Sequence, residues 1–339
     1  MANKRIGKQT VKLQNPPSII STASIVGPKE GEGPLRLYFD EIIEDELFGE
    51  KSWEKAESKL MRETFSKVLK KANKAADELD YIIAGDLLNQ CISANFGLRE
   101  SGVPFFGVYG ACSTMAESMS LGAILIDGEC ADNVVCLTSS HFCAAEKQFR
   151  FPLELGTQRP PTAQWTVTGS GGAVLSNKGS GPYITHVTTG KIIDMGIKDV
   201  NNMGAAMAPA AMDTIATHFK DTGFTPDSYD LIVTGDLGAV GKEICDELLR
   251  EKGYNITSIY NDCGLMIFDR ERQDAHAGGS GCGCSATVFA GFIYKKLMEG
   301  VLNNVLFVAT GALLSTTSSQ QGESIPSIAH AISISNSLS

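Results

Sequence analysis

The sequence has no long apolar run and no recognisable export signal. No stretch of its 339 residues approaches the roughly 20 consecutive apolar residues that a membrane-spanning helix needs. The charged N-terminal segment 1–14 is followed by neither an apolar run nor a cleavage site. We therefore expect a protein that is made and kept in the cytosol and has no transmembrane segment.

Paired cysteine motifs are also absent. The nine cysteines are an odd number with irregular gaps, which predicts reduced thiols and not a disulfide framework. Cys263, Cys282 and Cys284 lack the Cys-x2-Cys pairs of a structural zinc site, so we expect no metal site. The glycine-rich run 278–285 is not followed by Lys-Ser or Lys-Thr and is therefore no P-loop for phosphate.

Positive charge is scarce in this chain. Lys and Arg number 29 against 39 Asp and Glu, which gives a net charge of −10. A surface of this sign repels a phosphate backbone, so we expect no nucleic acid partner. The N-terminal tail is locally basic, and the sequence favours a solvated flexible end there over contact with an anionic membrane. The basic residues of the tail are Lys4, Arg5, Lys8 and Lys12.

The regular elements are visible from their periodicity. Apolar residues recur three and four positions apart over 53–75, which predicts one amphipathic helix. The segment 80–88 that follows is a short apolar strand ending in Gly85-Asp86. A strand without alternation is typical of burial on both faces, so a parallel sheet is predicted.

The second half of the chain repeats this pattern. The segment 230–238 follows the helical stretch 211–220 and matches 80–88 at five of nine positions. In each half the strand is followed by an apolar segment ending in cysteine, and then by another apolar strand. These paired segments are 103–112 with 255–263, and 133–139 with 304–310.

This order of matching segments predicts an internal duplication. Each copy is the size of a domain, so we expect a layered α/β fold of two halves, 1–180 and 181–339. Each half should contain a mixed sheet covered by helices. In the C-terminal tail, 315–324 is expected to be a loop and 328–334 a last strand.

Cys112 lies between a predicted buried strand and a helix that begins with small polar residues. A thiol at a helix start feels the positive end of the helix, which favours the thiolate and suits a nucleophile. Buried cysteines are also common as small core residues. The local sequence leaves both interpretations open.

Several motifs together resemble the thiolase and ketoacyl-synthase superfamily. They are Gly110-Ala111-Cys112, the glycine-rich segments 168–175 and 278–286, and the duplication itself. The resemblance implies an αβαβα layered fold with two pseudo-twofold-related halves, and pairing into dimers. It also implies an acyl-accepting cysteine at Cys112, with a histidine and a second histidine or asparagine supplied by the second half.

The sequence departs from this superfamily at both partner positions. Gly235-Asp236 stands where the first histidine is expected, and no asparagine occurs between Asn261 and Asn303. An aspartate opposes an oxyanion, and losing one oxyanion donor typically costs about 10²–10³ in rate. We therefore expect a binding protein with Cys112 as a vestigial nucleophile. The alternative is an acyltransferase that uses Cys112 with His276 or His141 as its base.

A narrower resemblance is to the stage V sporulation protein AD family. Short blocks agree in order along the chain, at 85–90, 110–114, 138–141, 147–152, 206–211, 261–267 and 309–315. The resemblance implies a role in sporulation and spore germination. It implies binding of dipicolinic acid, alone or as its calcium chelate, no other cofactor, and action with SpoVA membrane proteins at the spore inner membrane. The function implied by the resemblance is therefore to support uptake of the acid into the developing spore.

A flat pyridine with two carboxylates requires hydrogen-bond donors and a narrow slot. The candidates follow strand ends or lie in the glycine-rich turn; they are Cys112, Ser113, Thr138, Ser139, Ser140, His141, Asp236, Gly279 and Cys282. Asp236 could hold the calcium of a chelate, donate when protonated, or orient a neighbouring donor. Lys147, Arg150 and Arg159 could offset ligand charge, although the sequence favours solvated surface positions for them.

Overall fold

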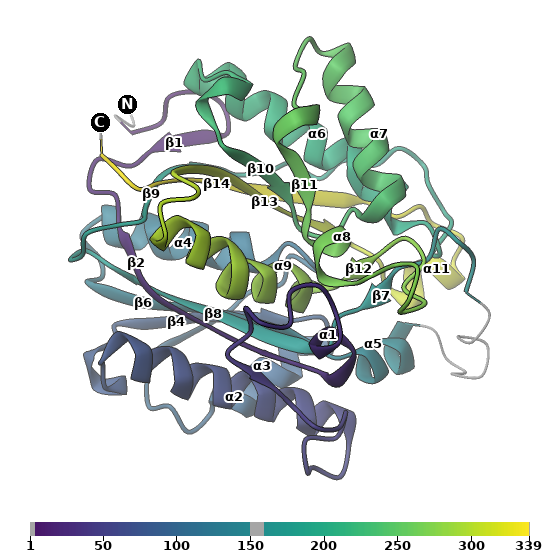
Figure 1. The fold of residues 1–339 in the computed structure, drawn as a ribbon, viewed down its shortest axis with the longest axis horizontal. Coiled ribbons are helices and arrows are strands. Elements are labelled where there is room, and N and C mark those ends of the chain that lie inside the picture. Colours follow the sequence, from purple (N-terminus) through teal and green to yellow (C-terminus); the bar gives the residue numbers. More distant parts are fainter. Residues whose placement is uncertain (1–3, 150–158, 339) are drawn as a thin grey trace.

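Strand pairing in the computed structural model divides the main sheet into two similar sets (Figure 1). The structure describes residues 4–149 and 159–338. Within them, 12 strands form one hydrogen-bonded sheet and two form a separate pair. The first set has the order β2-β8-β6-β4-β5 and the second the order β9-β14-β13-β10-β11. The two sets are joined where Ser18 pairs with Tyr183.

The bounds of the strands show which segments correspond. The first set is β2 (Ser18–Val26), β4 (Tyr81–Asp86), β5 (Phe105–Gly107), β6 (Asn133–Ser140) and β8 (Gly169–Ser176). The second is β9 (Tyr183–Thr188), β10 (Leu231–Thr234), β11 (Tyr260–Asp262), β13 (Asn304–Ala312) and β14 (Ser327–Ser335). The short strands are β1 (Thr10–Lys12), β3 (Glu41–Ile42), β7 (Trp165–Thr166) and β12 (Gly279–Ser280).

The direction of pairing is the same in both sets. β4 is parallel to β5 and β6, and β10 is parallel to β11 and β13. β8 is antiparallel to β6 and β2, as β14 is to β13 and β9. The duplicated sequence segments 80–88 and 230–238 therefore contain strands with equivalent neighbours. The division at residue 180 stays a prediction from the sequence.

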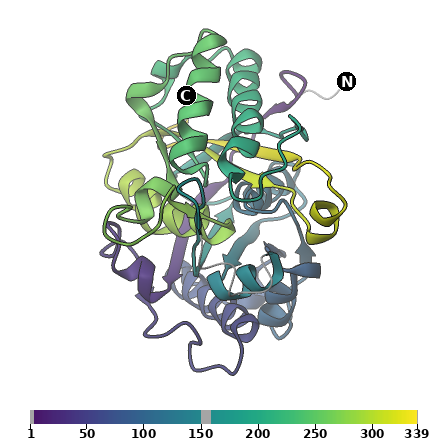
Figure 2. The same ribbon diagram turned by 90° about the vertical axis from the view of Figure 1, so that its right-hand side faces the viewer.

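Helices form three layers around the two sets of strands (Figures 1 and 2). α2 (Trp53–Ala72) and α3 (Ile92–Leu98) cover the outer face of the first set, and α6 (Met203–Thr222) with α7 (Gly238–Glu251) covers the second. α4 (Thr114–Asp127) and α9 (Cys282–Val288) lie between the sets and contact strands of the first. α9 continues through a π-helical turn, Phe289–Ile293, into α10 (Tyr294–Met298). The remaining helices are α1 (Pro28–Gly31), α5 (Phe142–Phe149), α8 (Cys263–Ile267) and α11 (Thr316–Gln320).

The first long helix has clear sequence signals at both ends. The Ser52 hydroxyl oxygen accepts a hydrogen bond from the Lys55 amide at 3.4 Å, which caps the N-terminus of α2. Asn73 ends the helix in the left-handed conformation with φ of 52°. The apolar face between them, including Leu60 and Met61, is fully buried, so amphipathic periodicity predicted this element well.

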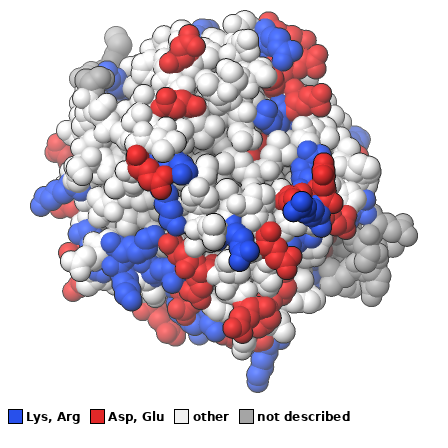
Figure 3. Space-filling view, in the orientation of Figure 1, with Lys and Arg blue, Asp and Glu red and all other residues white. Residues whose placement is uncertain are grey.

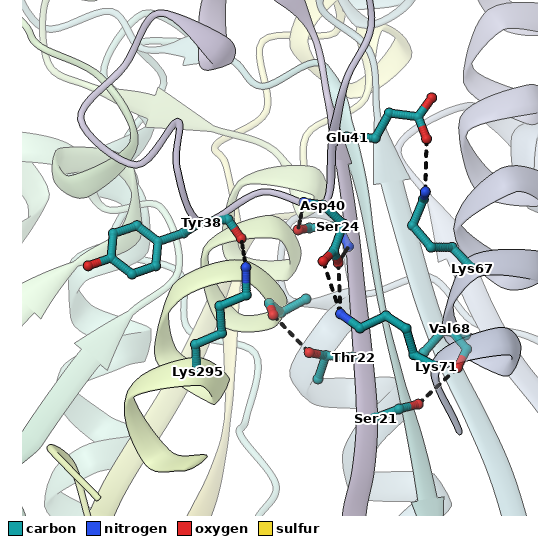
Figure 4. Close-up of polar contacts among 11 residues, drawn as sticks. Ser21, Thr22, Ser24, Tyr38, Asp40, Glu41, Lys67, Val68, Lys71 and Lys295 are labelled. Atoms are coloured by element: carbon teal, nitrogen blue, oxygen red, sulfur yellow. Dashed lines mark hydrogen bonds and ion pairs between the residues drawn. The ribbon is translucent and has the colours of Figure 1, made fainter. Parts of the chain in front are cut away.

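Side chains of β2 form hydrogen bonds to the helical layers on both sides of the strand (Figure 4). The Ser21 hydroxyl donates to the Val68 carbonyl oxygen of α2 at 3.0 Å, and the Thr22 hydroxyl donates to the Ala290 carbonyl oxygen at 2.8 Å. Neighbouring side chains of a strand point to opposite faces, so these two residues reach different layers. Ala290 lies in the π-helical turn.

Two expectations for the chain ends were wrong. The segment 315–324 contains the short helix α11, because the Ser315 hydroxyl oxygen accepts a hydrogen bond from the Ser318 amide at 3.0 Å and caps the turn. The N-terminal tail from Lys4 onward is not a free end, although Arg5, Lys8 and Lys12 are exposed to solvent as expected. β1 pairs with β9, and Lys4 forms an ion pair with Asp127 at 3.0 Å.

Candidate functional site

The turn before α4 meets the end of β13, and glycine makes this approach possible. A Cβ atom on Gly311 would overlap the carbonyl oxygen of Gly110. Ala111, next in the turn, has a φ of 50°, a left-handed conformation that costs a non-glycine residue free energy. Together these features place Cys112 of the first half against the second half.

A pocket of about 560 Å³, including its solvent-open part, lies at this junction. The part of this volume in which the centre of a water molecule fits is about 50 Å³. The wall combines apolar side chains with a few polar ones. It consists of Leu87, Tyr109, Ala111, Cys112, Ala145, Glu146, Phe149, Thr166, Val200, Met203, Ser280, Ala312 and Leu314.

Asp236 is fully buried behind this wall and is held by donors from several elements. Its Oδ1 accepts a hydrogen bond from the Thr310 hydroxyl at 2.7 Å. Its Oδ2 accepts from the Ser280 hydroxyl and from the Gly281 amide, each at 3.0 Å. Burial raises the pKa of Asp236, and these hydrogen bonds to the charged form oppose that shift.

The Cys112 thiol lies beside Asp236. Burial raises the pKa of Cys112 well above its usual value, and the nearby Asp236 carboxylate raises it further. The structure thus brings together two of the predicted site residues. A thiol in this environment stays protonated at neutral pH, which is the opposite of what nucleophilic catalysis requires.

Cys282 shares an apolar cluster with Cys112. Its thiol donates to the Ser139 carbonyl oxygen at 3.1 Å, and burial raises the pKa of Cys282 well above its usual value. Gly279 stands one residue before Ser280, and its carbonyl oxygen accepts a hydrogen bond from the Gln164 side chain at 2.8 Å. These two predicted residues therefore lie at the junction without lining the pocket itself.

The other predicted hydroxyl groups are used inside the protein. Ser113 donates to the Gly110 carbonyl oxygen at 2.6 Å, and Thr138 donates to the Gly85 carbonyl oxygen at 2.8 Å. Ser113 and Thr138 are buried, as are the next two residues, Ser139 and Ser140. Ser139 donates to a Glu57 carboxylate oxygen at 3.0 Å, and Ser140 donates to the Val167 carbonyl oxygen at 2.6 Å. Among the described residues, none of these four lines the pocket beside Cys112.

Two amides of the glycine-rich turn that could have served a ligand are used inside the protein. The Gly281 amide donates to Asp236, and the Gly283 amide donates to the Ser140 hydroxyl oxygen at 3.0 Å. A Cβ atom on Gly283 would contact the Gly169 carbonyl oxygen at 2.6 Å. The glycines therefore allow α9 to approach the first set of strands closely.

Neither histidine suggested as a base contacts Cys112. His141 is fully buried, and its Nε2 lies 2.7 Å from the Glu46 carbonyl oxygen. Burial lowers the pKa of His141, so the ring is neutral at ordinary pH. The Nε2 atom of His276 lies 2.9 Å from a carboxylate oxygen of Asp274. Within the part of the chain that the structure describes, neither side chain lines the pocket.

The predicted cations lie away from the pocket wall. Lys147 forms an ion pair with Glu54 at 2.6 Å. Arg159 lies over the Trp165 ring, with its guanidinium carbon 4.7 Å from the ring centroid. Arg150 lies outside the described residues. Among the residues described, no Lys or Arg lines the pocket.

Sequence reasoning missed several residues of this site. Ser280 and Thr310 both bind Asp236, and each lies inside a block of residues that the sequence had already marked. Gln164 binds the Asp236 carbonyl oxygen at 2.6 Å. Tyr109 and Glu146 line the pocket, and no motif identified them.

Solved structures with this architecture are thiolase-like enzymes. The chain matches 3-oxoacyl-[acyl-carrier-protein] synthase III from Aquifex aeolicus with a TM-score of 0.56 and 13% identity, over 94% of this chain and 99% of the other. It matches human mitochondrial 3-ketoacyl-CoA thiolase with a TM-score of 0.56 and 12% identity, over 96% and 99%. The thiolase-like α/β fold predicted from the sequence is confirmed.

Sequence comparison narrows the class to one family. The model of the stage V sporulation protein AD family matches residues 7–335. Stage V sporulation protein AD from Bacillus subtilis (strain 168) is 48% identical over 329 residues, which covers 97% of each chain. The chain belongs to the stage V sporulation protein AD family, so the predicted relationship is confirmed.

Proposed function

We propose that this protein binds dipicolinic acid, free or as its calcium chelate, and supports its uptake into the developing spore. Membership of a sporulation family supports the biological setting. The pocket beside Cys112 supports binding of a small ligand, because it combines apolar walls with a few polar groups. The acid is accordingly cargo held by this chain and not a substrate to be transformed.

The single observation that carries this proposal is the environment of Cys112. The group next to its thiol is the buried Asp236 carboxyl, which raises the pKa of the thiol. A negative group at this place also opposes the oxyanion of an acyl-transfer intermediate. The pocket can therefore still hold a ligand, although the Asp236 carboxyl group disfavours acyl transfer at Cys112.

Charge favours the calcium chelate over the free dianion. The described wall contains no Lys or Arg, and the Asp236 carboxyl group lies behind it, bonded to Ser280. A free dianion meets no cation among the described wall residues, so it loses hydration on entry unless a proton enters with it. Calcium cancels the two carboxylate charges of the ligand, so the chelate enters as a neutral group.

We further propose that two copies of the chain pair through the edge of the first set of strands. β5 ends the order of that set, and an edge strand offers unpaired backbone groups to a second copy. Large apolar side chains gather on α3, β5, the following turn and α4 with more than a third of their surface exposed. They are Ile92, Phe96, Phe106, Tyr109, Leu121 and Ile124. Tyr109 also lines the pocket, so pairing would cover one side of it.

The proposed place of action is the spore inner membrane, in company with SpoVA membrane proteins. No helix among the described residues is long and apolar enough to span a bilayer. Basic side chains over α2 do not form a uniform patch (Figure 3), because Lys67 and Lys71 are paired with Glu41 and Asp40, each at 3.0 Å. The surface therefore favours attachment through a protein partner over direct contact with the lipid.

Titration calorimetry on the full chain tests the proposal. Saturable heat with dipicolinic acid or its calcium chelate supports it, and Cys112→Ala should change the affinity only modestly. Thr316→Ala, at an exposed position outside this pocket wall, is a matched control. Absence of heat with both ligands, together with a mass shift at Cys112 after exposure to acyl thioesters, would instead establish the alternative acyltransferase.

A further inference from the structure

We propose that the pocket takes up a free dicarboxylate together with one proton. Asp236 binds this proton, and the Ser280 hydroxyl then donates a hydrogen bond to the ligand. This inference rests on the proposed function and concerns the same pocket. It assigns Ser280 as the ligand-contacting donor and Asp236 as a positioning residue behind it.

The Ser280 hydroxyl group carries a single proton. Ser280 lines the pocket, and its only O–H donates to Asp236 Oδ2 at 3.0 Å. A ligand carboxylate that accepts this O–H takes the donor away from Asp236. A fully buried carboxylate that loses a donor, and gains an anion in front of it, is strongly destabilised.

A proton on Asp236 resolves this conflict. The carboxyl O–H of Asp236 then donates to the Ser280 oxygen, and the Ser280 O–H donates to the ligand. Oδ1 keeps its hydrogen bond from Thr310, since that oxygen remains an acceptor. The proton comes from bulk water or buffer, so the ligand dianion and the proton enter together and the charge of the complex rises by one unit relative to the dianion alone.

The ionisable groups packed around Asp236 are four thiols and a carboxyl group. The thiols of Cys112 from the start of α4, Cys263 from α8, and Cys282 and Cys284 from α9 interact with it electrostatically. The Asp262 carboxyl at the end of β11 also interacts with Asp236. None of these groups is a cation, although the hydrogen bonds that Asp236 accepts, including one from the Cys112 thiol, stabilise its charged form. Burial already raises the pKa of Asp236 before any ligand is present.

The calcium chelate provides a matched comparison within the wild-type protein. Calcium neutralises the ligand carboxylates, so the chelate places no net charge in front of Asp236 and leaves less reason for a proton to bind. We expect uptake of about one proton with free dipicolinate and of nearly none with the chelate, because proton uptake follows the shift in pKa between the free and bound states.

Titration calorimetry in buffers of different ionisation enthalpy measures this number directly. With free dipicolinate the observed heat should depend on the buffer, and the affinity should fall about tenfold per pH unit between the pKa of Asp236 in the free protein and its higher pKa in the complex. With the chelate the heat should be the same in every buffer. Binding of free dipicolinate without any buffer dependence would overturn this inference and leave the proposed function standing. Absence of binding by either ligand overturns both.

Two variants locate the proton. Asp236→Asn supplies a permanent N–H donor to Ser280, so it should bind free dipicolinate without proton uptake and without pH dependence. Asp86→Asn changes the corresponding carboxyl of the first half, which accepts hydrogen bonds from the Leu88 and Ala94 amides. It should keep the wild-type proton number. Unchanged uptake in Asp236→Asn would contradict the assignment, whereas the wild-type measurement remains decisive if a variant does not fold.

Discussion

The hydrogen bond from Thr310 to Asp236 offers a quantitative test of the buried site. Thr310→Val removes the hydroxyl group and keeps the shape of the side chain. The lost bond to the carboxylate is 2.7 Å long and fully buried, and the Asp236 amide also loses its weaker bond of 3.3 Å to the Thr310 hydroxyl oxygen. A hydrogen bond to a charged group contributes about 1.5–3 kcal/mol, so we expect a loss of unfolding free energy of this size at pH 8.

The matched control is Thr138→Val. Thr138 is equally buried and donates over a similar distance, 2.8 Å, but its acceptor is the neutral carbonyl oxygen of Gly85. The expected loss for a bond between neutral groups is about 0.5–1.5 kcal/mol. Urea unfolding followed by circular dichroism measures both variants against the wild type.

The loss of unfolding free energy should depend on pH in Thr310→Val but not in Thr138→Val. The hydrogen bond from Thr310 lowers the pKa of Asp236, so it stabilises the ionised form that exists above that pKa. The cost of Thr310→Val should therefore shrink as the pH falls and Asp236 becomes protonated, whereas the cost of Thr138→Val should stay constant. Equal costs for both variants, or a cost of Thr310→Val that grows at low pH, would refute this description of the site.

Other predictions concern the surroundings of the site. Burial raises the pKa of Glu30 from 4.5 to about 8, so its contribution to stability is lost as the pH rises between these values, and Glu30→Gln should flatten the fall in urea midpoint measured from pH 5 to 9. Leu314→Trp, at the mouth of the pocket, should slow alkylation of Cys112 by N-ethylmaleimide about tenfold while the exposed Cys130 reacts at its normal rate, as read by peptide mass spectrometry. Phe106→Glu should convert a dimer to a monomer in light scattering; an unchanged mass would exclude pairing through β5.

The sequence predicted the elements and their duplication because these depend on local periodicity. The helix expected over 53–75 is α2, and the strands expected over 80–88 and 230–238 contain β4 and β10. The buried parallel strands are continuous apolar runs, so their pattern needs no knowledge of the tertiary structure. The capped turn of α11 was missed because Ser-rich segments resemble loops in composition.

The site was harder to predict because it depends on which donor meets which acceptor. The Gly281 amide and Asp236 are 45 residues apart, and the sequence alone does not show that they are bonded. Ser113 and Thr138 were plausible ligand donors by type and position, yet nearby carbonyl groups accept their hydrogen bonds. Conversely, Tyr109 and Glu146 reach the pocket only through the packing of the two halves.

The most direct test of the central claim is protection of Cys112 by the proposed ligand. Wild-type protein is treated with N-ethylmaleimide, with and without saturating dipicolinate or its calcium chelate, and the rates at Cys112 and Cys130 are compared by mass spectrometry. Because Cys112 lines the pocket and Cys130 is exposed elsewhere, the account predicts slower modification of Cys112 alone. Equal rates at Cys112 in the presence and absence of both ligands would contradict it.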